Sequence, residues 1–308
     1  MANVIETKNL TKHFGKVEAV SDVSLSVRKG EIYGFLGLNG AGKTTTIRML
    51  LGMIKPTLGE IFLNGNKLHF GKQGPWDKIG YMVETPNSYP ELTVRENLEV
   101  TRRLRRISDK GSVQKVIDKL TLNSYSARKT AHLSLGNAQR LGIAKALIHN
   151  PEMLLLDEPA NGLDPAGIVE MRDLLRNLVL NDSVTIFISS HILGEISKIA
   201  TRIGIIHNGR LIQEVNADSL ETLLHRRLLL NAVDRDGARK KLIEKGFAVR
   251  SLQEGTLEIN DENAINHPEE IADYLVRSGF PPTMLMVEQE DLESYFLRIT
   301  GMSKGKEK

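Results

Sequence analysis

This chain of 308 residues contains the stretch Gly37-Leu38-Asn39-Gly40-Ala41-Gly42-Lys43-Thr44-Thr45, from which its fold class can be predicted. It contains the full phosphate-loop pattern Gly-x-x-x-x-Gly-Lys-Thr. Residues 31–36 before it predict a short buried strand, and residues 46–51 after it predict a helix. The glycines let successive backbone N–H groups turn inward around a polyphosphate, and the helix N-terminus adds positive potential there. A glycine-rich turn without a ligand is the alternative, but strand, loop, Lys-Thr pair and helix together predict a nucleoside-triphosphate site.

Side chains from two segments are suited to the chemistry of a triphosphate. Lys43 can reach the β- and γ-phosphates, and the Thr44 hydroxyl is placed to ligate Mg²⁺. Asp157 ends the apolar run that begins at Met153, and a carboxylate at such a strand tip can hold Mg²⁺ directly or through water. The adjacent Glu158 is suited to polarise an attacking water. The alternative is an acidic pair that only caps a strand.

The composition predicts a soluble globular protein, with 41% apolar and 26% charged residues. The chain has no cysteine, which excludes disulfides and thiolate metal sites and fits a reducing compartment. It has no run of 18 apolar residues and no signal-peptide pattern at residues 1–6, so we expect any membrane role to come through a partner. The net charge of +3 is too small to predict nucleic-acid binding.

Strand and helix patterns alternate through about residue 215 and predict an α/β core: a phosphate-loop NTPase fold with a mixed, buried sheet. The expected strands include residues 17–27, and a mostly helical stretch at about 91–148 predicts an inserted helical subdomain. The composition shifts near Asp218. We therefore expect an ATP-binding domain at 1–218, a small α+β domain of ferredoxin-like βαββαβ order at 219–300, and a disordered tail at 301–308.

Three more segments narrow the prediction. They are Leu133-Ser134-Leu135-Gly136-Asn137-Ala138-Gln139-Arg140, Glu158-Pro159-Ala160-Asn161-Gly162-Leu163-Asp164-Pro165 and Ser189-Ser190-His191. Together with the phosphate loop, their order and spacing resemble the ATP-binding cassette (ABC) family, the ATPase subunits of ABC transporters. The resemblance covers residues 4 to about 215. It implies an ATPase that uses ATP and Mg²⁺.

The resemblance implies a role for each matching residue. Ser134 and Gly136 match the signature sequence, which in this family caps the γ-phosphate of ATP held by the other protomer. Asp164 matches the loop that communicates between the two sites. His191 matches a histidine that contacts the γ-phosphate, and Phe14 matches an aromatic residue that stacks on adenine. Each has a plainer reading alone: Ser134 as a helix cap, His191 as an ordinary histidine, Phe14 as core. The common register favours the family roles.

The predicted site thus has three parts. The catalytic residues are Glu158, His191 and Lys43. The metal ligands are Thr44, Asp157 and Glu84. The nucleotide-contacting residues are Phe14, Gly37, Leu38, Asn39, Gly40, Ala41, Gly42, Lys43, Thr44, Thr45, Glu84, Ser134, Gly136, Asn137 and Asp164.

Two positions depart from the family pattern. Glu84 stands where the family usually has a glutamine near Mg²⁺, and it adds negative charge beside the phosphates. The usual Leu-Ser-Gly-Gly-Gln signature is Leu-Ser-Leu-Gly-Asn here, so Asn137 has a shorter amide side chain. With the C-terminal domain, these departures resemble the ATPase subunits of exporters that give self-protection against bacitracin-like and lantibiotic peptides.

The resemblance implies partners and a place in the cell. We expect two copies, or one copy and a similar ATPase subunit, to close around two ATP at the cytoplasmic face of the membrane and to drive a separate integral membrane permease. Two alternatives stay open: a non-transport ABC ATPase, and a regulator that uses ATP only for dimerisation. The basic run Arg102, Arg103, Arg105 and Arg106 is either a solvated helix face or a contact with the permease or lipid headgroups.

Overall fold

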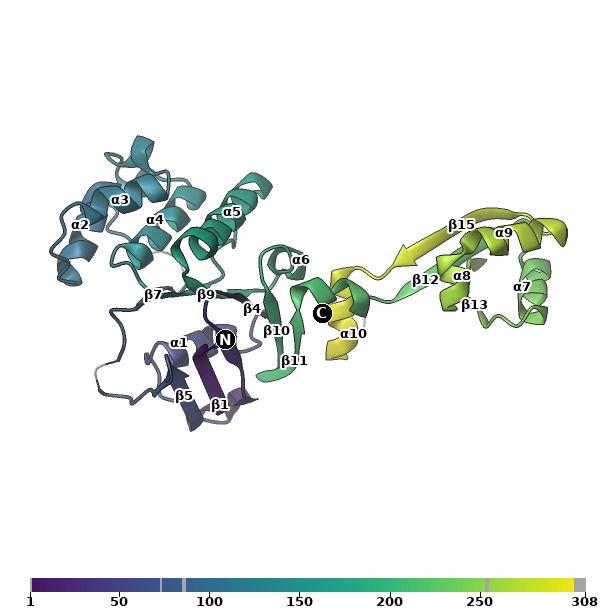
Figure 1. The fold of residues 1–308 in the computed structure, drawn as a ribbon, viewed down its shortest axis with the longest axis horizontal. Coiled ribbons are helices and arrows are strands. Elements are labelled where there is room, and N and C mark those ends of the chain that lie inside the picture. The colour runs from purple at the N-terminus through teal and green to yellow at the C-terminus, as the bar shows by residue number, and fades with distance from the viewer. Residues whose placement is uncertain (1, 73, 85–86, 253–254, 302–308) are drawn as a thin grey trace. The chain divides into compact units, whose positions relative to one another are not determined.

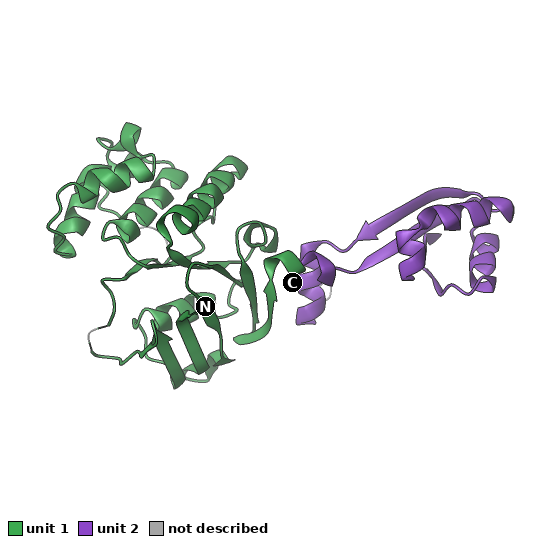
Figure 2. Cartoon of the chain, viewed as in Figure 1, with its two compact units in different colours: residues 1–219 green, residues 220–308 purple. Residues whose placement is uncertain are grey.

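The computed structural model describes residues 2–72, 74–84, 87–252 and 255–301. Contacts between Cα atoms divide the chain into two compact units, Met1–Ser219 and Leu220–Lys308, which Figure 2 colours separately. We call them unit 1 and unit 2 and describe each by itself. In the described residues no helix is long and apolar enough to cross a membrane.

A mixed six-stranded sheet in the order β11-β10-β4-β9-β8-β7 forms the centre of unit 1 (Figure 1). Its parallel strands are β4 (Ile32–Leu36), β7 (Ile79–Met82), β8 (Met153–Asp157), β9 (Thr185–Ser190) and β10 (Arg202–His207), and β11 (Arg210–Asn216) is antiparallel to β10. Every residue of β4 and β8 is buried, as continuous apolar runs require. The carboxyl ends of β4, β7, β8 and β9 therefore meet at one edge, where ligands bind in such sheets.

A second, antiparallel sheet packs on the same core. Its order is β2-β1-β5-β6, with β3 also paired to β1: β1 (Asn3–Phe14), β2 (Val17–Val23), β3 (Ser26–Arg28), β5 (Leu58–Leu63) and β6 (Asn66–Lys67). The single strand expected at 17–27 is thus two strands. Between them Leu25 bonds to Thr7, donating its N–H to Thr7 Oγ1 over 3.0 Å while its carbonyl accepts from the Thr7 N–H.

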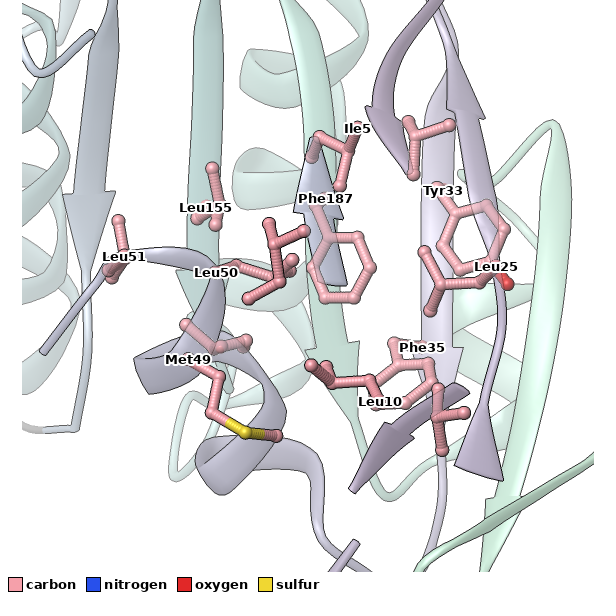
Figure 3. Close-up of a cluster of buried hydrophobic side chains, with 14 of the residues drawn as sticks. Ile5, Leu10, Leu25, Tyr33, Phe35, Met49, Leu50, Leu51, Leu155 and Phe187 are labelled. Atoms are coloured by element: carbon pink, nitrogen blue, oxygen red, sulfur yellow. The ribbon is translucent and has the colours of Figure 1, made fainter. Parts of the chain in front are cut away.

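The helix α1 (Lys43–Leu50) is fixed between the two sheets by apolar packing. Figure 3 shows Met49 and Leu50 of α1 in one cluster with Ile5 and Leu10 of β1 and with aromatic rings of the central sheet. The rings of Tyr33 and Phe187 stack with centroids 5.5 Å apart. This packing fixes the start of α1, where the phosphate loop ends.

The connection from β7 to β8 is mostly helical. It contains α2 (Val94–Leu104), α3 (Ser112–Lys119), the short turns η1 (Asn123–Tyr125) and η2 (Thr130–His132), and α4 (Leu135–Leu147). α5 (Pro165–Asp182) follows β8, α6 (Leu193–Ile196) follows β9, and the turn η3 (Ala217–Ser219) follows β11. α2, α3, α4 and α5 lie on the side of the central sheet opposite to α1 (Figure 1).

Unit 2 has its own sheet and its own apolar core. Its elements are η4 (Glu221–Leu223), β12 (Arg226–Ala232), α7 (Arg235–Glu244), β13 (Val249–Ser251), β14 (Leu257–Ile259), α8 (Glu262–Asn266), α9 (Pro268–Arg277), β15 (Pro282–Gln289) and α10 (Leu292–Thr300). All neighbours in the order β13-β14-β12-β15 are antiparallel, which is the strand order that a βαββαβ chain of ferredoxin-like type produces. The five-residue α8 was not expected. Of the tail expected at 301–308, residues 302–308 lie outside the described residues.

Candidate nucleotide-binding site

The phosphate loop joins the end of β4 to the start of α1 and needs glycine at two tight points. A Cβ on Gly37 would lie 2.5 Å from the Ile206 carbonyl oxygen. Gly42 caps α1 with a φ of 106° in the left-handed region, and a Cβ there would lie 2.6 Å from the Ala19 carbonyl oxygen. The loop therefore presents bare backbone at the N-terminus of α1, the arrangement that binds phosphate.

Lys43 is buried at the mouth of this loop, with 5% of its side chain exposed. Its Nζ donates to the Gly37 carbonyl over 2.6 Å and to the Leu38 carbonyl over 3.2 Å. The same Nζ lies 3.1 Å from Glu158 Oε1. The cation is thus held by the loop and by the carboxylate that follows β8, where phosphate oxygens could replace these partners.

Asp157 receives two hydroxyl hydrogen bonds at the end of β8. Thr44 Oγ1 donates to its Oδ2 over 2.7 Å, and Ser189 Oγ donates to its Oδ1 over 2.5 Å. Ser189 Oγ also accepts from the Glu158 N–H over 3.0 Å. Hydroxyl and carboxylate oxygens are the ligand type that Mg²⁺ prefers, so Thr44 and Asp157 fit this ion. The described residues contain no group of three or more Asp, Glu, His or Cys that could hold a metal ion.

Glu158 adopts a left-handed backbone with φ of 50°, an uncommon conformation for a residue with a Cβ. Its Oε2 lies 2.7 Å from His191 Nδ1, and an ionised carboxylate can only accept, so Nδ1 is the donor in this pair. Its Oε1 is buried and accepts no hydrogen bond. The turn after β8 thus holds one carboxylate oxygen through His191 and leaves the other beside Lys43.

The remaining nucleotide-side predictions, Phe14 and Glu84, lie on the surface. Phe14 ends β1 with 51% exposure, which excludes the core reading and leaves a ring face open for stacking. Lys12 Nζ lies 5.0 Å from the centroid of that ring. Glu84 follows β7 with 61% of its side chain exposed, and it forms an ion pair with Arg48 of α1.

The signature residues lie at the start of α4, and their hydrogen bonds stay within its first turn. Ser134 caps the helix, since its Oγ accepts from the Asn137 Nδ2 over 3.1 Å and from the Asn137 N–H over 3.4 Å. Asp164 caps α5 in the same way, accepting from the Gly167 N–H over 2.9 Å. The cap reading of Ser134 therefore holds, and it is compatible with a helix N-terminus that faces an anion.

Two residues that the sequence reasoning missed contact the predicted site. Ser189 lies between Asp157 and Glu158, and Arg48 pairs with Glu84. Ser189 was noted only as part of a motif. A signal for Arg48 existed: it follows Thr44 by four residues and therefore lies on the same face of α1.

Comparisons with known proteins agree with this geometry. A family profile described as "ABC transporter" matches residues 20–161. The chain is 40% identical over 304 residues to the bacitracin transport ATP-binding protein BcrA of Bacillus licheniformis, covering 98% of each chain. It is 36% identical over 220 residues to the lantibiotic transport ATP-binding protein SrtF of Streptococcus pyogenes, covering 71% of this chain and 94% of the relative.

Solved structures show the same architecture. An ATP-binding cassette of an ABC transporter in its ADP conformation superposes with a TM-score of 0.65 at 25% identity, covering 71% of this chain and 95% of that one. A dimeric cassette in a post-hydrolysis state bound to ADP and Pi gives 0.62 at 27% identity, covering 69% of this chain and 98% of that one. The resemblance predicted from the motifs is confirmed: the chain belongs to the ABC transporter family, as an ATP-binding and ATP-hydrolysing subunit.

Proposed function

We propose that this ATPase subunit drives export of a peptide antibiotic of the bacitracin or lantibiotic type. It does so through a separate integral membrane permease, at the cytoplasmic face of the membrane. The proposal is supported by the relative named for bacitracin transport, which matches over 98% of both chains. The observation that carries the chemistry is the meeting of Lys43, Asp157, Glu158 and His191 at one edge of the central sheet.

The roles proposed for the residues follow from this edge. The backbone of residues 37–42 and Lys43 bind the phosphates, and Phe14 stacks on the adenine. Mg²⁺ would be held by Thr44 and Asp157, with Glu84 as a further ligand, and it would neutralise charge on the phosphate oxygens. Glu158 orients and polarises the attacking water, and His191 holds the Glu158 carboxylate and contacts the γ-phosphate.

A second subunit completes each site in this proposal. Ser134, Gly136, Asn137 and Asp164 of one copy would face the nucleotide bound by the other, from the N-termini of α4 and α5. The dimeric cassette among the similar structures supports this arrangement. Residues 1–218 would be the catalytic domain and 219–300 an accessory domain. The non-transport and regulator readings are not favoured, because the full-length relative is a transport subunit and the Glu158–His191 pair is formed.

Replacing Glu158 tests the chemistry. Glu158→Gln keeps the size of the side chain but removes the base, so we expect ATP binding to persist and phosphate release to fall by about 100-fold or more. The closed dimer should accumulate with ATP, as measured by gel filtration. Glu152→Gln is the matched control, since Glu152 lies at the opposite end of β8 in an exposed pair with Lys78. Unchanged turnover in Glu158→Gln would refute the assigned role.

The export proposal needs a separate test in cells. Expressed together with the permease that co-purifies with it, the subunit should raise the bacitracin or lantibiotic concentration that stops growth, and Glu158→Gln should abolish this gain. Co-purification of the subunit with the permease from solubilised membranes should accompany it. Unchanged sensitivity with an active ATPase and a co-purifying permease would contradict this substrate class and leave the ATPase assignment intact.

A further inference from the structure

We propose that Arg48 is a positioning residue for Glu84, and that it offsets the negative charge that Glu84 brings to the nucleotide site. This inference rests on the proposed function, because it assumes that residues 37–45 bind ATP. It concerns the ion pair that Arg48 of α1 forms with Glu84, just beyond the end of β7.

The geometry begins with the spacing of two residues on α1. Thr44 and Arg48 are four positions apart, so their side chains leave the same face of the helix, one turn from each other. Thr44 donates to Asp157 at the end of β8, and Arg48 donates to Glu84 just beyond the end of β7. Because β7 and β8 are paired neighbours, one face of α1 makes two polar links to two adjacent strand ends.

The second observation is the backbone at Glu84. Its φ of 62° lies in the left-handed region, which costs energy for a residue with a Cβ. In this conformation the Glu84 carboxylate pairs with Arg48 of α1. Both side chains remain accessible, at 40% for Arg48 and 61% for Glu84, so the pair can open when a ligand offers the carboxylate another partner.

The third observation is where the other cation of the site is engaged. Lys43 is buried among two loop carbonyls and Glu158. Its position does not pair it with Glu84. In the described part of the chain, the ion pair that the structure forms at Glu84 is with Arg48. If ATP binds at the phosphate loop as proposed, its phosphates share the site with a carboxylate whose ion-pair partner in the described residues is Arg48, and like charges repel.

A double-mutant cycle isolates this pair. We would measure the dissociation constant of ATP in EDTA by equilibrium dialysis for the wild type, Arg48→Met, Glu84→Gln and the double variant. Arg48→Met should weaken ATP binding about two- to fivefold, the range of a partly exposed charge pair. In the Glu84→Gln background the same substitution should change it by less than about 1.5-fold, because no uncompensated carboxylate is left.

Two further variants separate positioning from a merely structural role. Arg48→Lys keeps the charge, so it should retain the affinity for ATP. Arg103→Met removes an exposed Arg–Glu pair on α2, across the central sheet from α1, and should leave the dissociation constant unchanged (Figure 1).

The outcomes are distinguishable. If Arg48→Met weakens ATP binding equally in both backgrounds, Arg48 contacts the phosphates itself. If it weakens ATP binding in neither, the Arg48–Glu84 pair has no effect on ATP affinity. Either result overturns the inference. A wild-type chain that binds no ATP in EDTA or with Mg²⁺ would contradict the proposed function instead. Circular dichroism of each variant checks that the fold is intact.

Discussion

At the scale of single residues, the hydroxyl of Ser189 does more than its position in a motif indicated. It has no exposed surface, and it holds both the Asp157 carboxylate and the backbone of Glu158. Such supporting hydrogen bonds fix the orientation of metal ligands. The residue therefore connects the proposed metal ligand with the proposed base.

Ser189→Ala should expose this connection. We expect the Mg²⁺ concentration for half-maximal hydrolysis to rise about tenfold, because Asp157 loses an orienting donor. The free energy of unfolding should fall by about 1–3 kcal/mol, since the Glu158 N–H and the carboxylate each lose a partner. Ser190→Ala is the control: its hydroxyl accepts from the Ile192 N–H, away from both carboxylates. A Mg²⁺ dependence equal to that of the wild type would contradict the role of Ser189.

The sequence predicted those residues whose place follows from local pattern. The phosphate loop, Asp157 and Glu158 each stand directly after a buried apolar strand, so parallel strands bring them to one edge. Ser189 was missed because its partner Asp157 lies 32 residues away, and nothing local indicates which strand end a side chain will meet. The spacing from Thr44 gives the face of α1 on which Arg48 lies, but it does not indicate the partner Glu84, 36 residues away. The positive φ values at Glu84 and Glu158 were equally invisible, because neither residue is a glycine.

At the scale of elements, a half-buried histidine joins the end of α4 to the edge strand β7. His149 follows α4, and its Nε2 lies 3.1 Å from the Ile79 carbonyl and 2.9 Å from Arg105 NH1. Burial and then the charge of Arg105 lower the pKa of His149 from 6.5 to about 4. The folded state therefore holds His149 neutral, between the end of α4 and the first residue of β7.

This shift predicts a pH dependence of stability. Because the folded pKa is depressed, the unfolded chain binds a proton first, so the contribution of His149 is present above pH 6.5 and is lost as the pH falls toward 4. Between pH 7 and pH 5 the free energy of unfolding should drop by about 1–2 kcal/mol more in the wild type than in His149→Gln. Urea unfolding at the two pH values measures this difference. Equal drops would show that His149 stays solvated.

Element patterns were predicted best where apolar residues run continuously. The strands expected over 31–36 and 153–157 match β4 and β8 to within one residue, because each contains a continuous run of buried residues. The prediction of one continuous strand at 17–27 was wrong, because Leu25 hydrogen-bonds to Thr7 between the two strands β2 and β3. The helix α8 was missed because five residues carry no measurable periodicity, although Asp261 caps it.

At the scale of the whole molecule, the two units have separate apolar cores. All residues assigned to the nucleotide site belong to unit 1. The lantibiotic transport relative matches 220 residues of this chain over 94% of its own length, which is about the length of unit 1. Unit 1 therefore contains what a shorter relative of the same family needs.

A chain ended after Ser219 should accordingly fold and bind ATP. We expect its dissociation constant for Mg²⁺-ATP to stay within about twofold of the full chain, because each unit buries its own core. Isothermal titration of both forms measures this, and differential scanning calorimetry should resolve two transitions in the full chain. A truncated chain that aggregates or fails to bind would show that unit 2 stabilises the catalytic unit.

The contact between Lys43 and Glu158 has a consequence for the order in which a subunit without nucleotide binds ATP and hydrolyses it. The Lys43 ammonium group cannot bind the Glu158 carboxylate and an incoming γ-phosphate with full strength at the same time. If Glu158 is the base, as proposed, ATP binding would therefore move Lys43 toward the phosphate and free the Glu158 carboxylate. In this proposal ATP binding is what frees Glu158 for catalysis, and a subunit without ATP keeps Glu158 paired with Lys43.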